Sequence, residues 1–467
     1  MEEKSKKLPR TISIFMLLMI NVAAVGSVKN WPLTAEYGFS SLFYLLLAGV
    51  IFLIPVSLIA AELATGWPKA GGIFVWVKEA FGHRVGFLAV WVLWIENVFW
   101  YPTVLSFIAG TMAYLFDPKL AENPFYMVGV VIAIFWAMTF INFTGMRTSG
   151  WISTIGAFCG TYLPALIIVG LGILWLVEGR EIHITFTLSS FFPRMTHPKD
   201  LAIFTGILLT LGGMEMAAVH ANDVKHPKRD YPKAILLSVI TILGLSALGV
   251  LAIAMVVPQQ EISLAAGTLQ AFTTFMEAYN LKSLIPVMAF LVMIGAMGTM
   301  STWLVGPTKG LLAAAMSGDL PPALRKVYRR GMPVNLLLLQ AGIVTLFSFL
   351  FILLPSVNSV YWISTVLAAN LYLVMYILMF AAAIKLRYKR PEVERAYRIP
   401  GGNFGMWLVA GVGLLGAILT FLFGFLPPEQ IQTGNELAYS LFLILGVLLG
   451  CLAPSMILWF KKPAWSV

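Results

Sequence analysis

The sequence contains few charged residues. Only 11% of its 467 residues are Asp, Glu, Lys or Arg, whereas 59% are hydrophobic. Soluble domains carry about 25% charged residues, and a water-soluble fold could not hide so much apolar surface. The low charge content excludes a soluble enzyme and indicates an integral membrane protein.

Other absences bear on function. The chain has two cysteines, Cys159 and Cys451, and both fall inside apolar segments, so we expect no disulfide framework. The five histidines show no metal-binding spacing, no paired intramembrane aspartates occur, and a TVGYG-type filter is missing. A membrane-embedded enzyme and an ion channel are therefore the weaker competing functions, and we expect no catalytic residue, metal or cofactor.

Long apolar stretches are what the chain has in abundance. A helix needs roughly 20 apolar residues to cross a bilayer, and alternation of the β-barrel type is absent, so the spans are predicted to be helical. About twelve stretches meet this length: 11–35, 40–65, 85–116, 124–144, 150–177, 201–222, 233–257, 283–316, 334–355, 358–386, 403–426 and 437–460.

Positive charge is distributed unevenly among the connections. Of the 31 Lys and Arg residues, 25 fall in the termini and alternate loops, with a cluster from Lys385 through Arg387 and Arg395 to Arg398. The positive-inside rule then places both termini in the cytoplasm and predicts an inner-membrane protein. Because the positive charges fall in every second loop, as membrane topology requires, we expect no nucleic-acid partner despite the net charge of +10.

The first and sixth stretches are interrupted at matching places. The first contains Ala24, Gly26 and Ser27, and the sixth contains Gly212 and Gly213. Small residues beside a charge, in equivalent segments of two halves, are typical of broken helices around a binding site at mid-membrane. Close packing through small residues is the alternative. A break exposes backbone N–H and C=O groups, which could bind both ends of a zwitterion.

Four polar residues are predicted at membrane depth: Lys29, Glu96, Asn97 and Glu215. An isolated charge there costs roughly 2.5–3.5 kcal/mol or more, so each is a candidate functional residue. Glu215 could carry a proton, because a desolvated site disfavours the carboxylate, or it could be structural. Lys29 could pair with Glu215 or Glu96, or it could contact substrate.

Three motifs carry a resemblance. Residues 61–82 read AELATGWPKAGGIFVWVKEAFG, residues 213–234 run from Gly-Met-Glu through NDVKHPKRDYPKA, and residues 318–322 read GDLPP. Together they resemble the amino acid–polyamine–organocation (APC) superfamily of permeases, and most closely its glutamate:GABA antiporter group.

The resemblance implies an all-α, LeuT-like fold with a five-plus-five inverted repeat and two extra helices. We expect a cytoplasmic tail at 1–10, one transport domain at 11–460 and a second tail at 461–467. The domain would divide into repeats at 11–177 and 200–386 and extra helices at 403–460. The residues that the resemblance implies for substrate binding are Ala24, Gly26, Ser27, Asn97, Gly212, Gly213 and Trp303, with Glu215 in proton coupling or gating. From their charge at membrane depth, we add Lys29 to the substrate-binding residues, although it departs from the family pattern, and Glu96 to the proton-coupling or gating residues.

The implied activity is secondary transport of an amino acid or its decarboxylated amine by alternating access, through exchange or proton coupling. The tryptophan that stacks on cationic substrates in the arginine:agmatine relative corresponds to Leu209, which weakens the alternative of a polyamine or cationic amino acid permease. The expected partners are a small-molecule substrate, membrane lipid and possible protons. The chain is expected to act as a monomer or homodimer, and the sequence does not choose among substrates.

The predicted orientation can be tested by labelling single cysteines. Cysteine introduced at Lys119 or Glu429 should react with an impermeant thiol reagent from outside, and cysteine at Lys225 or Arg390 only after lysis, because loop charges place the latter pair inside. The reverse pattern would overturn the orientation.

Overall fold

The computed structural model describes residues 13–68, 71–193, 201–218, 227–328, 331–354, 356–428 and 435–465. The predicted tail at 1–10 and the predicted loop residues Lys69, Lys225 and Glu429 lie outside this part of the chain. Within the described residues the chain is helical, and its single β-bridge joins Tyr328 and Met332. The all-α membrane fold predicted from the sequence is confirmed.

Ten helical segments of the described residues are long and apolar enough to cross a membrane. The unbroken ones are α6 (His83–Ala113), α7 (Pro124–Asn142), α13 (Pro227–Val256), α15 (Ile285–Met316), α18 (Val357–Lys389), α19 (Gly402–Phe423) and α20 (Glu436–Trp459). Three more are composite, namely α3 (Ser41–Ala48) with α4 (Ile54–Gly66), α8 (Met146–Ile155) with α9 (Leu163–Val177), and α16 (Val334–Ser348) with α17 (Leu350–Leu353).

Two further apolar segments are interrupted. The first consists of α1 (Ile14–Val25), a short 3-10 turn at Val28–Asn30 and α2 (Trp31–Ala35). The other consists of α11 (Ala202–Thr210) and α12 (Met214–Ala218). They account for the remaining two of the predicted crossings, and their breaks fall at the glycines identified in the sequence.

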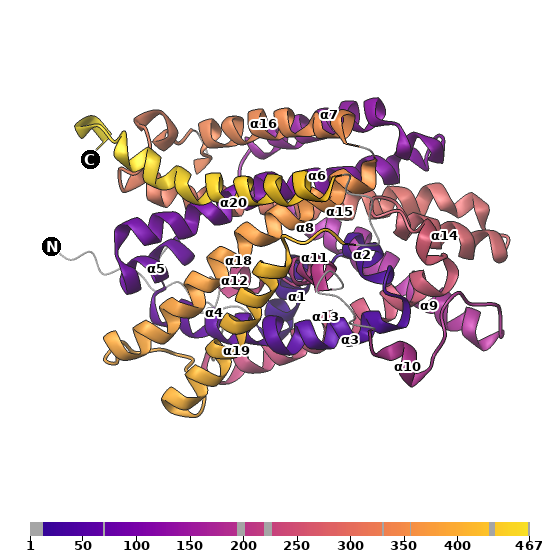
Figure 1. Ribbon diagram of the computed structural model, residues 1–467, viewed down its shortest axis with the longest axis horizontal. Helices are drawn as coiled ribbons and strands as arrows, with labels where there is room; N and C mark the ends of the chain where they lie inside the picture. The colour runs from indigo at the N-terminus through magenta and orange to yellow at the C-terminus, as the bar shows by residue number, and fades with distance from the viewer. Residues whose placement is uncertain are drawn as a thin grey trace.

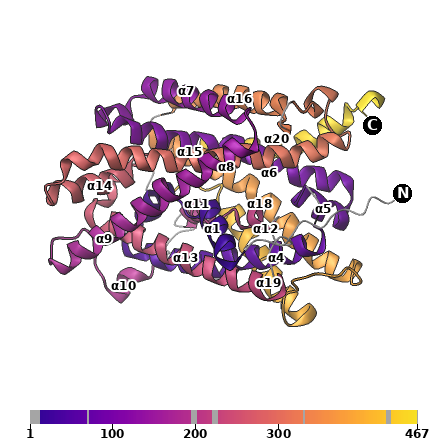
Figure 2. The ribbon, with the colours of Figure 1, turned by 180° about the vertical axis from the view of Figure 1, so that it is seen from behind.

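Short helices lie at the two ends of the bundle. The connection α5 (Ile73–Phe81) lies at the end where α20 finishes, whereas α10 (Leu188–Phe191) and α14 (Gly267–Ala278) lie at the opposite end (Figures 1 and 2). The broken segments α1, α11 and α12 lie near the middle in both views.

Burial separates central helices from peripheral ones. In the most apolar 18-residue window, α6 is 78% buried and α18 is 72% buried, but α20 is only 22% buried. Helices α6 and α18 therefore form the core beside the broken segments, and α20 offers most of its surface to lipid. Glycines permit the closest approach in the bundle, because Cβ atoms on Gly156 and Gly160 would collide with the backbone of α15.

Candidate substrate-binding site

The break in the first segment comprises two residues in extended conformation. Helix α1 ends where the N–H of Gly26 donates to the carbonyl of Val22 at 2.7 Å, and Gly26 and Ser27 have ψ values of 111° and 126°. The carbonyl of Val28, just beyond the break, accepts the hydroxyl of Thr268 at 2.9 Å. Helical hydrogen bonding stops at the extended residues, which leaves backbone groups available in the membrane interior.

The break in the second segment depends on glycine. Gly213 has a φ of +121°, a conformation that L side chains rarely adopt, and its N–H donates to the hydroxyl of Tyr376 at 3.1 Å. A Cβ on Gly213 would lie 2.9 Å from the ring of Trp303, and one on Gly212 would lie 2.7 Å from the ring of Tyr372. Aromatic rings therefore occupy the space that side chains would need at this break.

The two breaks lie against each other. The side-chain amide of Asn30 donates to the carbonyl of Thr210 at 3.4 Å, and a Cβ on Gly213 would approach the carbonyl oxygen of Ala24 to 3.4 Å. Beside them is a cavity whose lining includes Ala24, Ser27 and Gly212 from the two breaks. The breaks of α1 and α11–α12 thus form one wall of a cavity in the middle of the bundle.

Lys29 is buried at one side of this cavity. Its ammonium donates to the hydroxyl of Thr103 at 3.4 Å and lies 4.9 Å from the ring centroid of Trp100 and 5.8 Å from that of Tyr361. Of the alternatives left open for Lys29, neither the pairing with Glu215 nor that with Glu96 is present, because the ion pairs among the described residues do not include Lys29. Cation–π contacts and one neutral hydroxyl stabilise the ammonium instead.

Glu215 is buried directly after the glycine break. Its two carboxyl oxygens accept hydrogen bonds from the hydroxyls of Tyr372 and Tyr376, the latter at 2.7 Å. The tyrosine rings lie 4.5 Å apart, and Tyr372 packs edge-on to Trp303 at 6.3 Å. Helix α18 therefore holds α12 through two phenol groups at Glu215.

Glu96 and Asn97 approach the cavity from α6. Both are buried, and the Asn97 amide donates to the carbonyl of Leu93 at 2.9 Å and to Glu96 at 2.5 Å. The described ion pairs do not include Glu96. The cavity is thus lined by one buried cation, Lys29, and by one buried carboxyl without a cationic partner among the described residues.

The structure gathers most of the predicted site residues. Those that line the cavity are Ala24, Ser27, Lys29, Glu96, Asn97, Gly212 and Trp303. Gly26, Gly213 and Glu215 lie just behind the lining, within the breaks or next to them. The neighbouring Tyr101 of α6 is not part of the lining; its hydroxyl accepts from Gln340 at 3.3 Å and its ring packs on Phe135.

The residues that surround Lys29 were not predicted from the sequence. Trp100 and Thr103 come from α6 and Tyr361 comes from α18. Glu96, Trp100 and Thr103 follow the i, i+4, i+7 spacing of one helix face, so the face was detectable once Glu96 had been singled out. Their contact with Lys29 depends on how two distant helices pack.

Comparison with known proteins gives a consistent result along the chain. Residues 8–449 match the model of a family described as amino acid permease. A protein described as an uncharacterized transporter from Legionella pneumophila is 45% identical over 95% of this chain and 96% of its own length.

Relatives with named substrates are more distant. A glutamate/gamma-aminobutyrate antiporter of Lactococcus lactis is 33% identical, and the match covers 96% of this chain and 90% of that protein. A probable agmatine/putrescine antiporter of the same species is 25% identical, with 94% and 93% covered.

Proposed function

The chain belongs to the amino acid permease family and is a transporter rather than an enzyme, and from this premise we propose that it exchanges glutamate for γ-aminobutyrate (GABA). The substrate would bind at the two breaks and cross by alternating access. We propose further that both termini are cytoplasmic, that the repeats span 11–177 and 200–386, and that the membrane is the bacterial inner one.

The choice of substrate rests on the environment of Lys29. Lys29 is a buried ammonium without a carboxylate partner among the described residues, so its charge is not compensated by the protein there. A substrate carboxylate would compensate it. At the same cavity, Glu96 would face the substrate ammonium. Glutamate and GABA share a carboxylate and an ammonium separated by a short aliphatic chain, so both can bridge these two groups.

Cationic amines fit this cavity less well. A diamine such as putrescine would place a second cation in the same desolvated cavity as Lys29, where charges of like sign repel strongly. Leu209, which lines the cavity, cannot stack on a guanidinium as a tryptophan can. Exchange of agmatine for putrescine, which the more distant relative suggests, is therefore a second candidate function, but the charge and lining of this cavity disfavour it.

Glu215 gives the site a means of coupling transport to protons. Its partners are two hydroxyls, which can accept from a protonated carboxyl as well as donate to an ionised one. Glu215 can therefore gain or lose a proton and keep both tyrosines as hydrogen-bond partners, while the strength of these two hydrogen bonds changes. We propose that this change biases the position of α12 relative to α18.

The proposed exchange can be measured in proteoliposomes. Vesicles loaded with GABA should take up labelled glutamate, whereas empty vesicles should take up little, because exchange requires a substrate on the opposite side. Vesicles loaded with putrescine provide the comparison. Putrescine exchange faster than glutamate–GABA exchange would overturn the proposal in favour of a polyamine carrier.

Replacement of Lys29 tests the electrostatic argument. In Lys29→Ala, the apparent affinity for glutamate should fall by about tenfold to a hundredfold, because a charge-assisted hydrogen bond contributes about 1.5–3 kcal/mol. Cationic substrates should be less affected. The matched control is Lys119→Ala, in an exposed connection outside the cavity. An equal loss for acidic and cationic substrates would contradict a direct role of Lys29.

Replacement of Glu215 tests proton coupling. Glu215→Gln keeps the shape and hydrogen bonding of the neutral form and cannot ionise. We expect the variant to bind substrate and to transport it with a flattened profile, varying by less than about twofold between about pH 5 and 8, where the parent varies by about tenfold or more. Uptake series run side by side would check this. A variant that keeps the parental profile would show that Glu215 is structural.

A further inference from the structure

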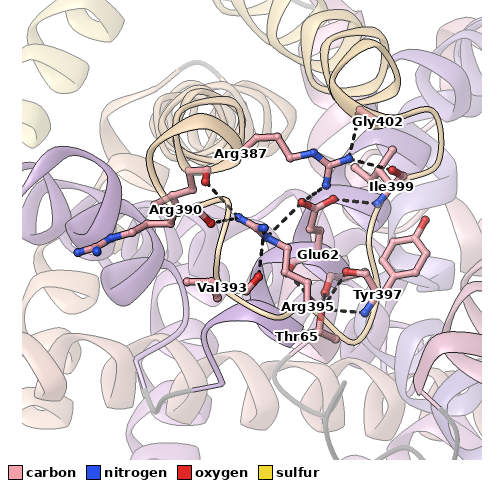
Figure 3. A network of polar contacts seen from close by, with 11 residues as sticks. Glu62, Thr65, Arg387, Arg390, Val393, Arg395, Tyr397, Ile399 and Gly402 are labelled. Carbon is pink, nitrogen blue, oxygen red and sulfur yellow. Dashed lines mark hydrogen bonds and ion pairs between the residues drawn. The ribbon is translucent and has the colours of Figure 1, made fainter.

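Another buried carboxyl, Glu62, lies away from the cavity, near the end of α4. Figure 3 shows it between two guanidinium groups. Arg387 on α18 donates to Glu62 at 2.5 Å, and the Nε atom of Arg395 lies 3.3 Å from the same carboxyl oxygen. The other Glu62 oxygen accepts the backbone N–H of Ile399 at 2.8 Å. All three charged side chains are at most 2% exposed.

The arginines also bind the connection that follows α18. Arg387 donates to the carbonyls of Ile399 and Gly402, both at 2.9 Å. Arg395 donates to the carbonyls of Leu386 and Arg390 at 3.1 and 3.2 Å (Figure 3). Residues 390–402 are thereby folded back over the ends of α4 and α18.

A second set of contacts closes the same connection onto α4. The hydroxyl of Thr65 donates to the carbonyl of Tyr397 and accepts its N–H, both at 3.2 Å. The guanidinium of Arg395 lies 5.1 Å from the ring centroid of Trp67. Lys389, at the end of α18, donates to the carbonyl of Glu79 at the end of α5 at 3.0 Å. Four segments therefore meet at one junction.

This junction is unsuited to opening and closing in each transport cycle. Removing one partner from a buried ion pair leaves an uncompensated charge, which is strongly unfavourable. Separation of α4 from α18 would remove the ion-pair partners of Glu62 and leave several backbone carbonyls without hydrogen-bond donors. By contrast, Glu215 is held by two neutral hydroxyls and can exchange them at lower cost.

The junction is rigidly connected to the cavity. Helix α18 runs unbroken from Val357 to Lys389 and contains neither glycine nor proline. Arg387 is on the same helix as Tyr376, about 16 Å further along its axis. A displacement of the helix at Arg387 would thus shift the tyrosines that hold Glu215.

We infer that Glu62, Arg387 and Arg395 fasten α4, α18 and residues 390–402 into one body that stays joined throughout transport, and that this body positions Tyr372 and Tyr376 against Glu215. Arg387 is a positioning residue in this scheme, since it acts through the tyrosines. The inference rests on the proposed function for the part played by Glu215. The joining of the three segments does not depend on which substrate is carried.

Glu62→Gln tests the positioning role. We expect the folded variant to bind substrate within about twofold of the parent but to exchange it about tenfold or more slowly, because small misplacements of positioned groups cost rate. Its pH profile should shift as well. The matched control is Glu392→Gln, which breaks the exposed pair with Arg390 in the same connection and should change neither value. If folded Glu62→Gln exchanges at the parental rate with the parental pH profile, the junction serves stability alone and the inference fails.

A covalent link tests the joining directly and does not require Glu62 to be changed. Thr65→Cys and Tyr397→Cys are combined with Cys159→Ala and Cys451→Ala, and the new pair is linked by oxidation or by a short bifunctional thiol reagent. Linked protein should exchange substrate within about twofold of the reduced form, because segments that never separate are not hindered by a bond between them. Linkage that abolishes exchange, with recovery after reduction of the bond, would overturn the inference.

The two proposals fail in different measurements. Failure of glutamate–GABA exchange would already be evident in the parental protein. Failure of the inference would be evident only as a difference between linked and reduced protein, measured with whichever substrate the parent carries.

Discussion

The constraint on which this structure depends is that backbone polar groups inside a membrane must find partners within the protein or its ligand. A break in a membrane helix is therefore possible only where other groups converge. At the break of α1, Asn30 reaches the carbonyl of Thr210, and Thr268 reaches that of Val28. At the break of α11–α12, the hydroxyl of Tyr376 accepts the N–H of Gly213. The cavity lies where these partners converge on the two breaks.

The buried charges of the chain divide according to the kind of partner they have. Glu62 is paired with guanidinium groups, which stay charged at any pH that proteins experience. Glu215 is paired with phenol hydroxyls, which can serve a carboxyl in either protonation state. Lys29 has only a hydroxyl and aromatic faces around it. The first arrangement suits a permanent joint, and the other two suit groups whose partners change during transport.

The sequence predicted the fold more completely than the site. Apolar length alone located the third crossing at 85–116, where the structure has His83–Ala113, because the bilayer sets the length of every span. The glycines and buried charges located the breaks. Trp100, Thr103 and Tyr361 were missed because their contact with Lys29 arises from packing between α1, α6 and α18. Arg387 and Arg395 were recognised only as charges of one connection, since loop parity indicates a side of the membrane but not burial.

Helix α18 links these separate observations. Tyr361 near its start lies over the ammonium of Lys29, Tyr372 and Tyr376 at its middle hold Glu215, and Arg387 near its end is fixed to Glu62. Sharp kinks in a long helix arise mostly at proline, at glycine or at an inserted group, and α18 contains neither proline nor glycine, so a shift at one of these places is passed along the helix. A substrate carboxylate would act on α18 by drawing Lys29 away from Tyr361. A proton would act on the same helix by altering the hydrogen bonds of Glu215 to Tyr372 and Tyr376. The protein could in this way combine substrate and proton signals without any contact between their binding groups.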